Sequence, residues 1–312
     1  MRALKVNLMV MTAILLWASA FVGIRVGLAC YSPGSLALLR FSVASIFMGI
    51  IYWAQKTTQS VHWHDRILLI LAGMGGIGIY NICLNYGELS VSAGIASFII
   101  GLMPIITIIL SVIFLQERLQ RGTWTGITVS VLGLSLIALS EQSSPGIQQG
   151  ILAILVSALM GAILTIIQKQ FAQKYHPVAI IFWVMCGGTL FLSVFFPRLI
   201  GELQQAEQIT TWAIIYMGVF PAAIAYLAWS YALKHLTASA VSVSLYALPL
   251  VSTFLGYILL NEQPSSSSLL GSLITLLGAY LANRSQRLGE QSVIDSSEEE
   301  INFLGKASGE GL

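Results

Sequence analysis

The polar residues best placed to do chemistry in this sequence form a stripe within an apolar run. Asn81, Asn85 and Glu88 are spaced by four and then three residues, so they lie along one face of an α-helix. Tyr80 stands beside the stripe. Amide and phenol groups on one helix face can hold a ligand by hydrogen bonds. The spacing therefore predicts a binding surface that includes Tyr80, Asn81 and Asn85.

Aromatic and basic residues share one face of the first apolar run. Trp17, Phe21 and Arg25 recur at intervals of four residues. Aromatic rings can hold the apolar part or the ammonium group of a ligand, and a guanidinium group suits a carboxylate. Arg40, in the next apolar run, is a second basic candidate for the same anion. The alternative for both arginines is that they reach out to lipid headgroups or donate hydrogen bonds to loop carbonyls.

Other parts of the chain add further polar and aromatic candidates. The remaining predicted binding residues are Ser97, Gln168, Tyr226, Trp229, Ser230 and Tyr246. Together with the two faces above, they could line a central cavity from both halves of the chain. An interfacial aromatic belt and hydrogen bonds between helices are the alternative, and a serine often bonds its own helix backbone. These candidates therefore predict binding only as a set.

Patterns typical of catalysis are missing from the sequence. It contains no HExxH, no GxxxxGK[ST] and no Ser/His set, which excludes the common metallohydrolase, ATP-driven and nucleophilic arrangements. The four histidines fall in loops, and the three cysteines have no ligand spacing. We therefore expect a protein that is not an enzyme, with no cofactor, no bound metal and no nucleic-acid partner.

The elements that must position the candidates are membrane helices. Apolar residues make up 56% of the chain and charged residues 9%, and the mean hydropathy is +0.84. A soluble domain carries about 25% charged residues. A helix of about 20 apolar residues crosses a bilayer, and lipid excludes unpaired backbone groups. Ten such segments are predicted, near 6–28, 34–54, 67–87, 91–115, 122–140, 149–169, 177–197, 211–232, 237–260 and 267–283.

The sequence contains the same stretch twice. Residues 81–135 align with residues 226–280 at a constant offset of 145 and without a gap. Equivalent residues in the alignment include Tyr86/Tyr231, Ser97/Ser242, Pro104/Pro249, Glu117/Glu262, Gly126/Gly271 and Gly133/Gly278. An offset of 144 likewise aligns Arg25, Tyr31 and Pro33 with Lys169, Tyr175 and Pro177. Because each copy has five helices, an odd number, the second copy must enter the membrane from the opposite side.

The predicted fold is therefore an all-α integral membrane protein with ten transmembrane helices as two inverted five-helix repeats, 1–140 and 149–284. With the N-terminus inside, twelve Lys and Arg residues fall on the inner side and one in the outer loops. This bias predicts a multi-pass protein with both termini cytoplasmic. Residues 285–312 are polar, acidic and without periodicity, which predicts a disordered acidic cytoplasmic tail.

Several motifs give the sequence a family resemblance. They are LLWASAFVGIRVGL and YSPGSLALLRF near the N-terminus, the doubled Pro-x(12)-Glu, and Gly126 with Gly271. Over about residues 1–284 the chain resembles the EamA-type ten-helix permeases of the drug/metabolite transporter superfamily. The resemblance implies transport of amino acids, nucleotide-related metabolites or drugs, commonly outward across the bacterial inner membrane. Ala20 departs from the family pattern, which usually has a polar residue there.

The function predicted from this sequence is secondary transport, exporting amino acids or similar small metabolites by alternating access. Its partners would be a small-molecule substrate and membrane lipid, with Pro104 and Pro249 as hinges. A homodimer stays open, because Gly23-x3-Gly27 and Gly122-x3-Gly126 suit contacts within a chain as well as between chains. The alternative function is a non-transporting membrane component, a sensor or lipid-modification partner, that acts through its cytoplasmic tail.

Overall fold

The computed structural model describes most of the chain as helix. It describes residues 2–55, 60–91, 93–116, 120–139 and 147–260, and then 266, 270–271, 273–275, 277–278, 280–282 and 284–285. Within these residues every regular element is helical and no strand occurs. Glu117, Glu262 and the predicted tail after Ser285 lie outside the described residues.

Seven helical stretches in the described ranges are long and apolar enough to cross a membrane. They are Leu4–Gly27, Pro33–Ala54, Trp63–Gly87, Gln148–Ala172, Pro177–Gln205, Gln208–His235 and Ala238–Leu259. Each overlaps one of the ten segments predicted above. The chain is therefore a helical membrane protein.

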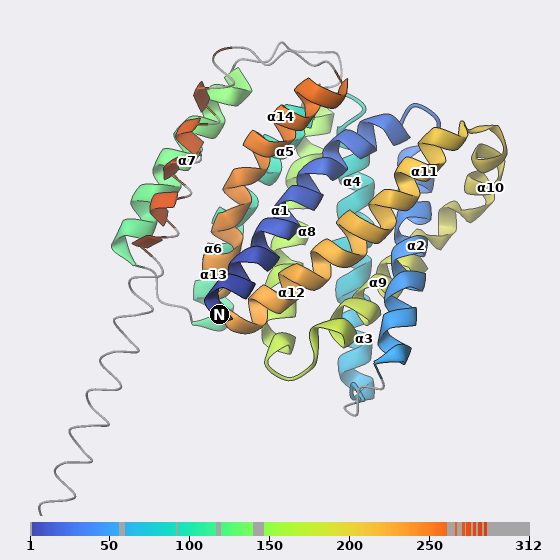
Figure 1. Cartoon of the computed structure of the whole chain (residues 1–312), viewed down its shortest axis with the longest axis horizontal. Helices are drawn as coiled ribbons and strands as arrows, with labels where there is room; N and C mark the ends of the chain where they lie inside the picture. The colour runs from blue at the N-terminus through green and yellow to red at the C-terminus, as the bar shows by residue number, and fades with distance from the viewer. Residues whose placement is uncertain are drawn as a thin grey trace, which may run out of the picture.

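Figure 1 shows how the helices follow one another along the chain. The first half contains α1 (Arg2–Gly27), α2 (Pro33–Ala54), α3 (Trp63–Gly73), α4 (Tyr80–Gly87), α5 (Ala93–Ile100), α6 (Met103–Leu115) and α7 (Arg121–Leu139). The second half contains α8 (Ile147–Ala172), α9 (Pro177–Leu192), α10 (Phe196–Gln205), α11 (Gln208–Met217), α12 (Ala225–His235), α13 (Ala238–Ser242) and α14 (Leu248–Leu260). The helical residues described between 266 and 285 are called the C-terminal helix below.

Two spans contain a π-helical segment at equivalent positions. Met74–Ile79 joins α3 to α4, and Gly218–Ile224 joins α11 to α12. The offset of 145 residues maps 74–79 onto 219–224. Pro221 lies inside the second segment and lacks an amide hydrogen, so the regular hydrogen-bond ladder cannot continue through it. Wide turns of this kind are frequent at functional sites.

Two other spans are interrupted just before a proline. After α5 ends at Ile100, α6 begins at Met103 and has Pro104 in its first turn. A 3₁₀ segment, Val243–Ala247, separates α13 from α14, which has Pro249 as its second residue. A first turn accepts proline because its amide needs no partner there. Each proline therefore lies in the first turn of the α-helix that follows the interruption.

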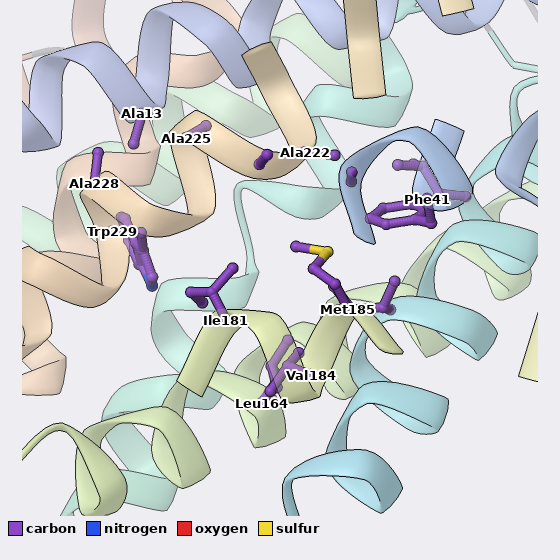
Figure 2. Close-up of a cluster of buried hydrophobic side chains, with 14 of the residues drawn as sticks. Ala13, Phe41, Leu164, Ile181, Val184, Met185, Ala222, Ala225, Ala228 and Trp229 are labelled. Atoms are coloured by element: carbon purple, nitrogen blue, oxygen red, sulfur yellow. The ribbon is translucent and has the colours of Figure 1, made fainter. Parts of the chain in front are cut away.

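The main contacts between the two halves come in equivalent pairs: replacing each helix by its counterpart in the other half gives a second contact that is also observed. α1 packs on α12 and α14, and the equivalent α8 packs on α4 and α6. Likewise α5 contacts α14, and the equivalent α13 contacts α6. Small side chains, Ala13 on α1 with Ala225 and Ala228 on α12, lie at the first of these contacts (Figure 2). Each half therefore packs largely against the other.

Equivalent helices that meet run in opposite directions. Gly34 at the start of α2 lies against Phe195, in the 3₁₀ segment Ser193–Phe195 that follows α9. Near the other end of α2 the ring of Tyr52 stacks on Phe182 of α9, with centroids 4.7 Å apart. Between these ends, the hydroxyls of Ser45 and Thr189 are hydrogen-bonded at 2.8 Å. The offset of 144 relates Ser45 to Thr189. The two helices are therefore antiparallel about equivalent positions.

The same arrangement occurs between α7 and the C-terminal helix, at the edge of the bundle (Figure 1). The backbone at Gly126 lies against Ala282, and a Cβ added at Gly133 would lie 2.5 Å from the nitrogen of Thr275. Ser130 Oγ donates to the Thr275 carbonyl at 3.2 Å. The glycines let the two backbones approach closely. The second small-residue motif, which ends at Gly126, therefore makes its contact within the chain.

Candidate functional site

A cavity lies where the two halves meet. Its volume is about 50 Å³. Its lining residues are Trp17, Ala20, Phe21, Ile24, Arg40, Tyr80, Asn81, Leu84, Ile100, Met103, Gly161, Leu164, Thr165, Gln168, Tyr226, Trp229, Leu245 and Leu248. They come from α1, α2, α4, α8, α12 and the two interrupted spans.

Most of this lining is built from equivalent positions of the two sequence copies. The offset of 144 pairs Trp17/Gly161, Ala20/Leu164, Phe21/Thr165 and Ile24/Gln168. The offset of 145 pairs Asn81/Tyr226, Leu84/Trp229, Ile100/Leu245 and Met103/Leu248. Only Arg40 and Tyr80 have no lining counterpart, because their equivalents are Val184 and Ala225, which do not line the cavity. These two residues give the cavity its asymmetry.

One wall of the cavity is aromatic. The ring centroid of Trp17 lies 5.1 Å from that of Tyr226, edge-on, and 5.0 Å from that of Trp229. The indole nitrogen of Trp17 donates to the Pro221 carbonyl at 3.0 Å, so the π-helical segment supplies its partner. In Figure 2 the Trp229 side chain extends from α12 toward Ile181 of α9. Such ring pairs contribute about 0.5–1.5 kcal/mol each beyond their buried area, which fixes this wall.

Arg40 and Asn81 form a polar, positively charged part of the cavity lining. Arg40 is 4% exposed, and its Nη1 makes a long contact of 3.5 Å with Asn81 Oδ1. Asn81 Nδ2 donates to the Ile77 carbonyl at 2.9 Å, so the amide oxygen points toward the guanidinium. Arg40 Nε and Gln168 Oε1 are buried without a hydrogen-bond partner. Buried polar groups are normally paired, so this part of the cavity is suited to bind a polar ligand group.

Seven of the twelve predicted binding residues line the cavity, and five do not. The seven are Trp17, Phe21, Tyr80, Asn81, Gln168, Tyr226 and Trp229. Among the five, Ser97 Oγ accepts from Ser252 Oγ at 2.9 Å, Ser230 is fully buried, and Tyr246 lies in a separate apolar cluster with Ile108 and Ile127. The predicted hinges Pro104 and Pro249 each follow a lining residue, Met103 and Leu248 respectively.

Arg25 and Asn85 bind backbone carbonyls instead of facing the cavity. Arg25 Nη1 donates to the Glu88 carbonyl at 3.0 Å, and Asn85 Nδ2 donates to the Pro33 carbonyl at 2.9 Å. Lys169, the equivalent of Arg25, donates to the carbonyl of Leu233, the equivalent of Glu88, at 2.8 Å. The same cation-to-helix-end contact is thus made once in each half.

The twelve predicted binding residues omit the aliphatic part of the lining, and Arg40, named above as a second basic candidate, is not among them. Charge alone could not rank Arg40 above Arg25, because both lie in apolar runs. The offset between the two sequence copies could have predicted other lining residues. Applying the offset to Trp229 gives Leu84, and applying it to Phe21 gives Thr165, and both of these residues line the cavity.

Comparison with known proteins gives a consistent family. Residues 4–139 and residues 148–284 each match the EamA-like transporter family. "Uncharacterized transporter YdfC" of Bacillus subtilis (strain 168) is 34% identical over 281 residues, covering 89% of this chain and 91% of that protein. An "Uncharacterized transporter" of Archaeoglobus fulgidus is 35% identical over 268 residues, covering 86% of this chain and 95% of that protein.

Two further comparisons concern substrate and fold. The "Probable terminal-alkyne amino-acid exporter" of Streptantibioticus cattleyicolor is 30% identical over 268 residues, covering 86% of this chain and 90% of that protein. A crystal structure superposes with a TM-score of 0.70 at 20% identity, covering 91% of this chain and 98% of the other. At that identity the superposition shows a shared fold only.

Proposed function

We propose that this chain, which belongs to the EamA-like transporter family, is a secondary transporter that exports amino acids or similar small metabolites by alternating access. Its family and its named relatives are transporters, a class without enzymatic activity, so the family predicted from the sequence is confirmed. The cavity lined by equivalent residues of both halves carries the proposal. The relative named as an amino-acid exporter supports the substrate class.

We infer that the two sequence copies, 1–140 and 149–284, are inverted five-helix repeats. Support comes from the antiparallel contact of α2 with α9 and of α7 with the C-terminal helix. Each contact joins equivalent helices, and a two-fold axis in the membrane plane makes equivalent helices antiparallel where they meet. The bias of Lys and Arg to one side supports cytoplasmic termini, and the family resemblance supports the bacterial inner membrane.

Alternating access would follow from the position of the cavity. Because equivalent residues of both halves line it, a rocking motion of one half against the other would open it to each side in turn. The breaks before Pro104 and Pro249 lie next to lining residues, so these prolines are proposed as hinges. The apolar part of the substrate would lie against Trp17, Tyr226 and Trp229.

A transport assay with two matched variants tests this function. Purified protein in liposomes is offered amino acids, nucleotide derivatives and cationic drugs, with and without a pH gradient. Trp229→Ala removes the buried indole of the aromatic wall and should abolish transport at unchanged membrane abundance. Trp212→Ala removes a 67% exposed indole from the same span and should leave transport unchanged.

Two results would count against the proposal in different ways. Undiminished transport by Trp229→Ala would show that the substrate binds elsewhere. A wild-type protein that moves no member of the panel would instead favour the non-transporting role, that of a sensor or lipid-modification partner.

A further inference from the structure

Arg40 gives the cavity a single fixed charge. Among the eighteen lining residues it is the one cation, and none of the eighteen is acidic. The other lining groups are aromatic, aliphatic, hydroxyl or amide. A ligand that enters the cavity therefore meets positive charge at one place only.

The surrounding protein leaves part of the hydrogen-bonding capacity of this guanidinium unused. The ion pairs found within the described residues, Lys174–Asp65 and Arg198–Glu202, do not involve Arg40. Glu88 acts on Arg40 electrostatically, but Glu88 does not line the cavity. Desolvating a cation costs several kcal/mol unless partners replace its water. The guanidinium makes one long hydrogen bond, to Asn81, and its Cζ lies 5.2 Å from the ring centroid of Phe41. Its Nε has no hydrogen-bond partner, so it keeps capacity for an anion.

The backbone at Arg40 makes a close contact that also occurs at the equivalent position of the other half. A Cβ added at Gly218 would lie 2.6 Å from the Arg40 carbonyl oxygen, so this part of α2 rests directly on the π-helical segment. The equivalent glycine, Gly73, rests in the same way on the carbonyl of Val184, the equivalent of Arg40. One half therefore presents a guanidinium where the other half presents an apolar side chain. The cavity is polarised although the backbone around it is repeated.

We propose that Arg40 binds the carboxylate of the transported molecule, so that the substrates are small carboxylic acids with an apolar body and the corresponding amides and amines are excluded. This inference rests on the transport function proposed above. The planar guanidinium can donate two parallel hydrogen bonds to a carboxylate, and Asn81 lies beside it. The apolar body then lies against Trp17 and Trp229. The substrate is thus oriented with its anionic group toward α2 and α4.

Matched ligands test the inference on the unmodified protein. Liposomes containing the protein are loaded with acid and amide pairs, L-phenylalanine with L-phenylalaninamide and L-leucine with L-leucinamide, and with the amines phenethylamine and isopentylamine. Only the group at the carboxyl position changes within each set. A hydrogen bond to a charged group corresponds to roughly a 10- to 100-fold difference, so the acids should leave at least about 10-fold faster than the amides or amines.

Variants of Arg40 separate binding from structure. Arg40→Gln should bring the acid-to-amide rate ratio close to one, and Arg40→Lys should retain part of it. Arg198→Gln, which removes an exposed arginine, should keep the wild-type ratio. A role in stability alone would slow acid and amide equally, which leaves the ratio unchanged.

The outcomes separate this inference from the transport function. Amides that the wild-type protein moves as fast as acids would overturn the role of Arg40 and leave the transport function intact. An unchanged ratio in Arg40→Gln would do the same. If that variant does not reach the membrane, the wild-type ratio decides. Movement of none of the compounds, acids included, would overturn the proposed amino-acid transport and this inference with it.

Discussion

Two cations at equivalent positions bind the ends of neighbouring helices. Arg25 donates to the Glu88 carbonyl after α4 at 3.0 Å, and Lys169 donates to the carbonyls of Leu233 and Leu236 at the end of α12, at 2.8 and 2.5 Å. The last carbonyls of a helix have no partner within it, and a cation also interacts favourably with the helix dipole there. We predict that Arg25→Ala and Lys169→Ala both destabilise the fold, with Lys169→Ala having the larger effect.

The expected magnitudes follow from the number of hydrogen bonds lost. A hydrogen bond to a charged group contributes about 1.5–3 kcal/mol, and the lower value applies because both side chains are only partly buried. Arg25→Ala loses one such bond, about 1.5 kcal/mol, and Lys169→Ala loses two, about 3 kcal/mol. At about 2 °C per kcal/mol for a chain of this size, the melting temperature should fall by about 3 °C and about 6 °C.

Intrinsic tryptophan fluorescence of the purified protein during heating measures these shifts. The two cations bind different carbonyls, that of Glu88 for Arg25 and those of Leu233 and Leu236 for Lys169. The double variant should therefore lose about 9 °C, the sum of the single losses. Arg121→Ala removes an exposed cation from α7 and should shift the melting temperature by less than about 1 °C. The reasoning fails if Arg25→Ala and Lys169→Ala behave like Arg121→Ala, because other groups would then satisfy these carbonyls. Lys169→Arg should restore most of the loss.

Three further outcomes can be measured with the same preparations. Gly218→Ala and Gly73→Ala each force a methyl group onto a carbonyl, so both should lower the melting temperature. Only Gly218→Ala displaces Arg40, so it alone should also lower the acid-to-amide transport ratio. An equal effect of the two variants on that ratio would contradict this prediction. His176 Nδ1 accepts a hydrogen bond from the Val178 amide at 3.4 Å. Burial, and after it the charge of Lys234, lowers the pKa of His176 below its usual 6.5. The contribution of His176 to stability is therefore present above about pH 6.5 and lost as the pH falls through the lowered pKa. His176→Gln should reduce the pH dependence of the melting temperature between about pH 5 and 7. A pH dependence equal to that of the wild type would refute this role of His176. Gly133→Leu should separate α7 from the C-terminal helix and lower the melting temperature, whereas Gly201→Leu, where a Cβ meets nothing within 4 Å, should not.

Local rules explain why the sequence was enough to predict the helices. Apolar runs in lipid have one stable backbone solution, because every amide must be bonded within its own segment. Pro33 and Pro177 mark the starts of α2 and α9, where a fixed φ and a missing amide cost nothing. The repeat also predicted which residues of the two halves are equivalent. In many such pairs both residues line the cavity.

Interruptions within the spans depended on packing that the sequence does not display. Pro104 and Pro249 indicated a disturbance, but a proline inside an apolar run is compatible with a kink or with a complete break. The breaks occur where equivalent residues, Ile100 and Leu245, face a shared cavity. The π-helical segment Met74–Ile79 contains no proline, so no proline in the sequence indicated that the regular α-helix is interrupted there.

The sequence by itself determined a membrane-embedded, duplicated helical chain with a polar and aromatic centre, because composition, length and register are properties of the chain alone. Only the tertiary structure decided that Arg40 faces the cavity while Arg25 binds the Glu88 carbonyl. Both arginines must replace the water that they lose in the membrane, and a carbonyl, a headgroup or a ligand can do so. The partner that each receives depends on the rotation of its helix and on the element packed opposite.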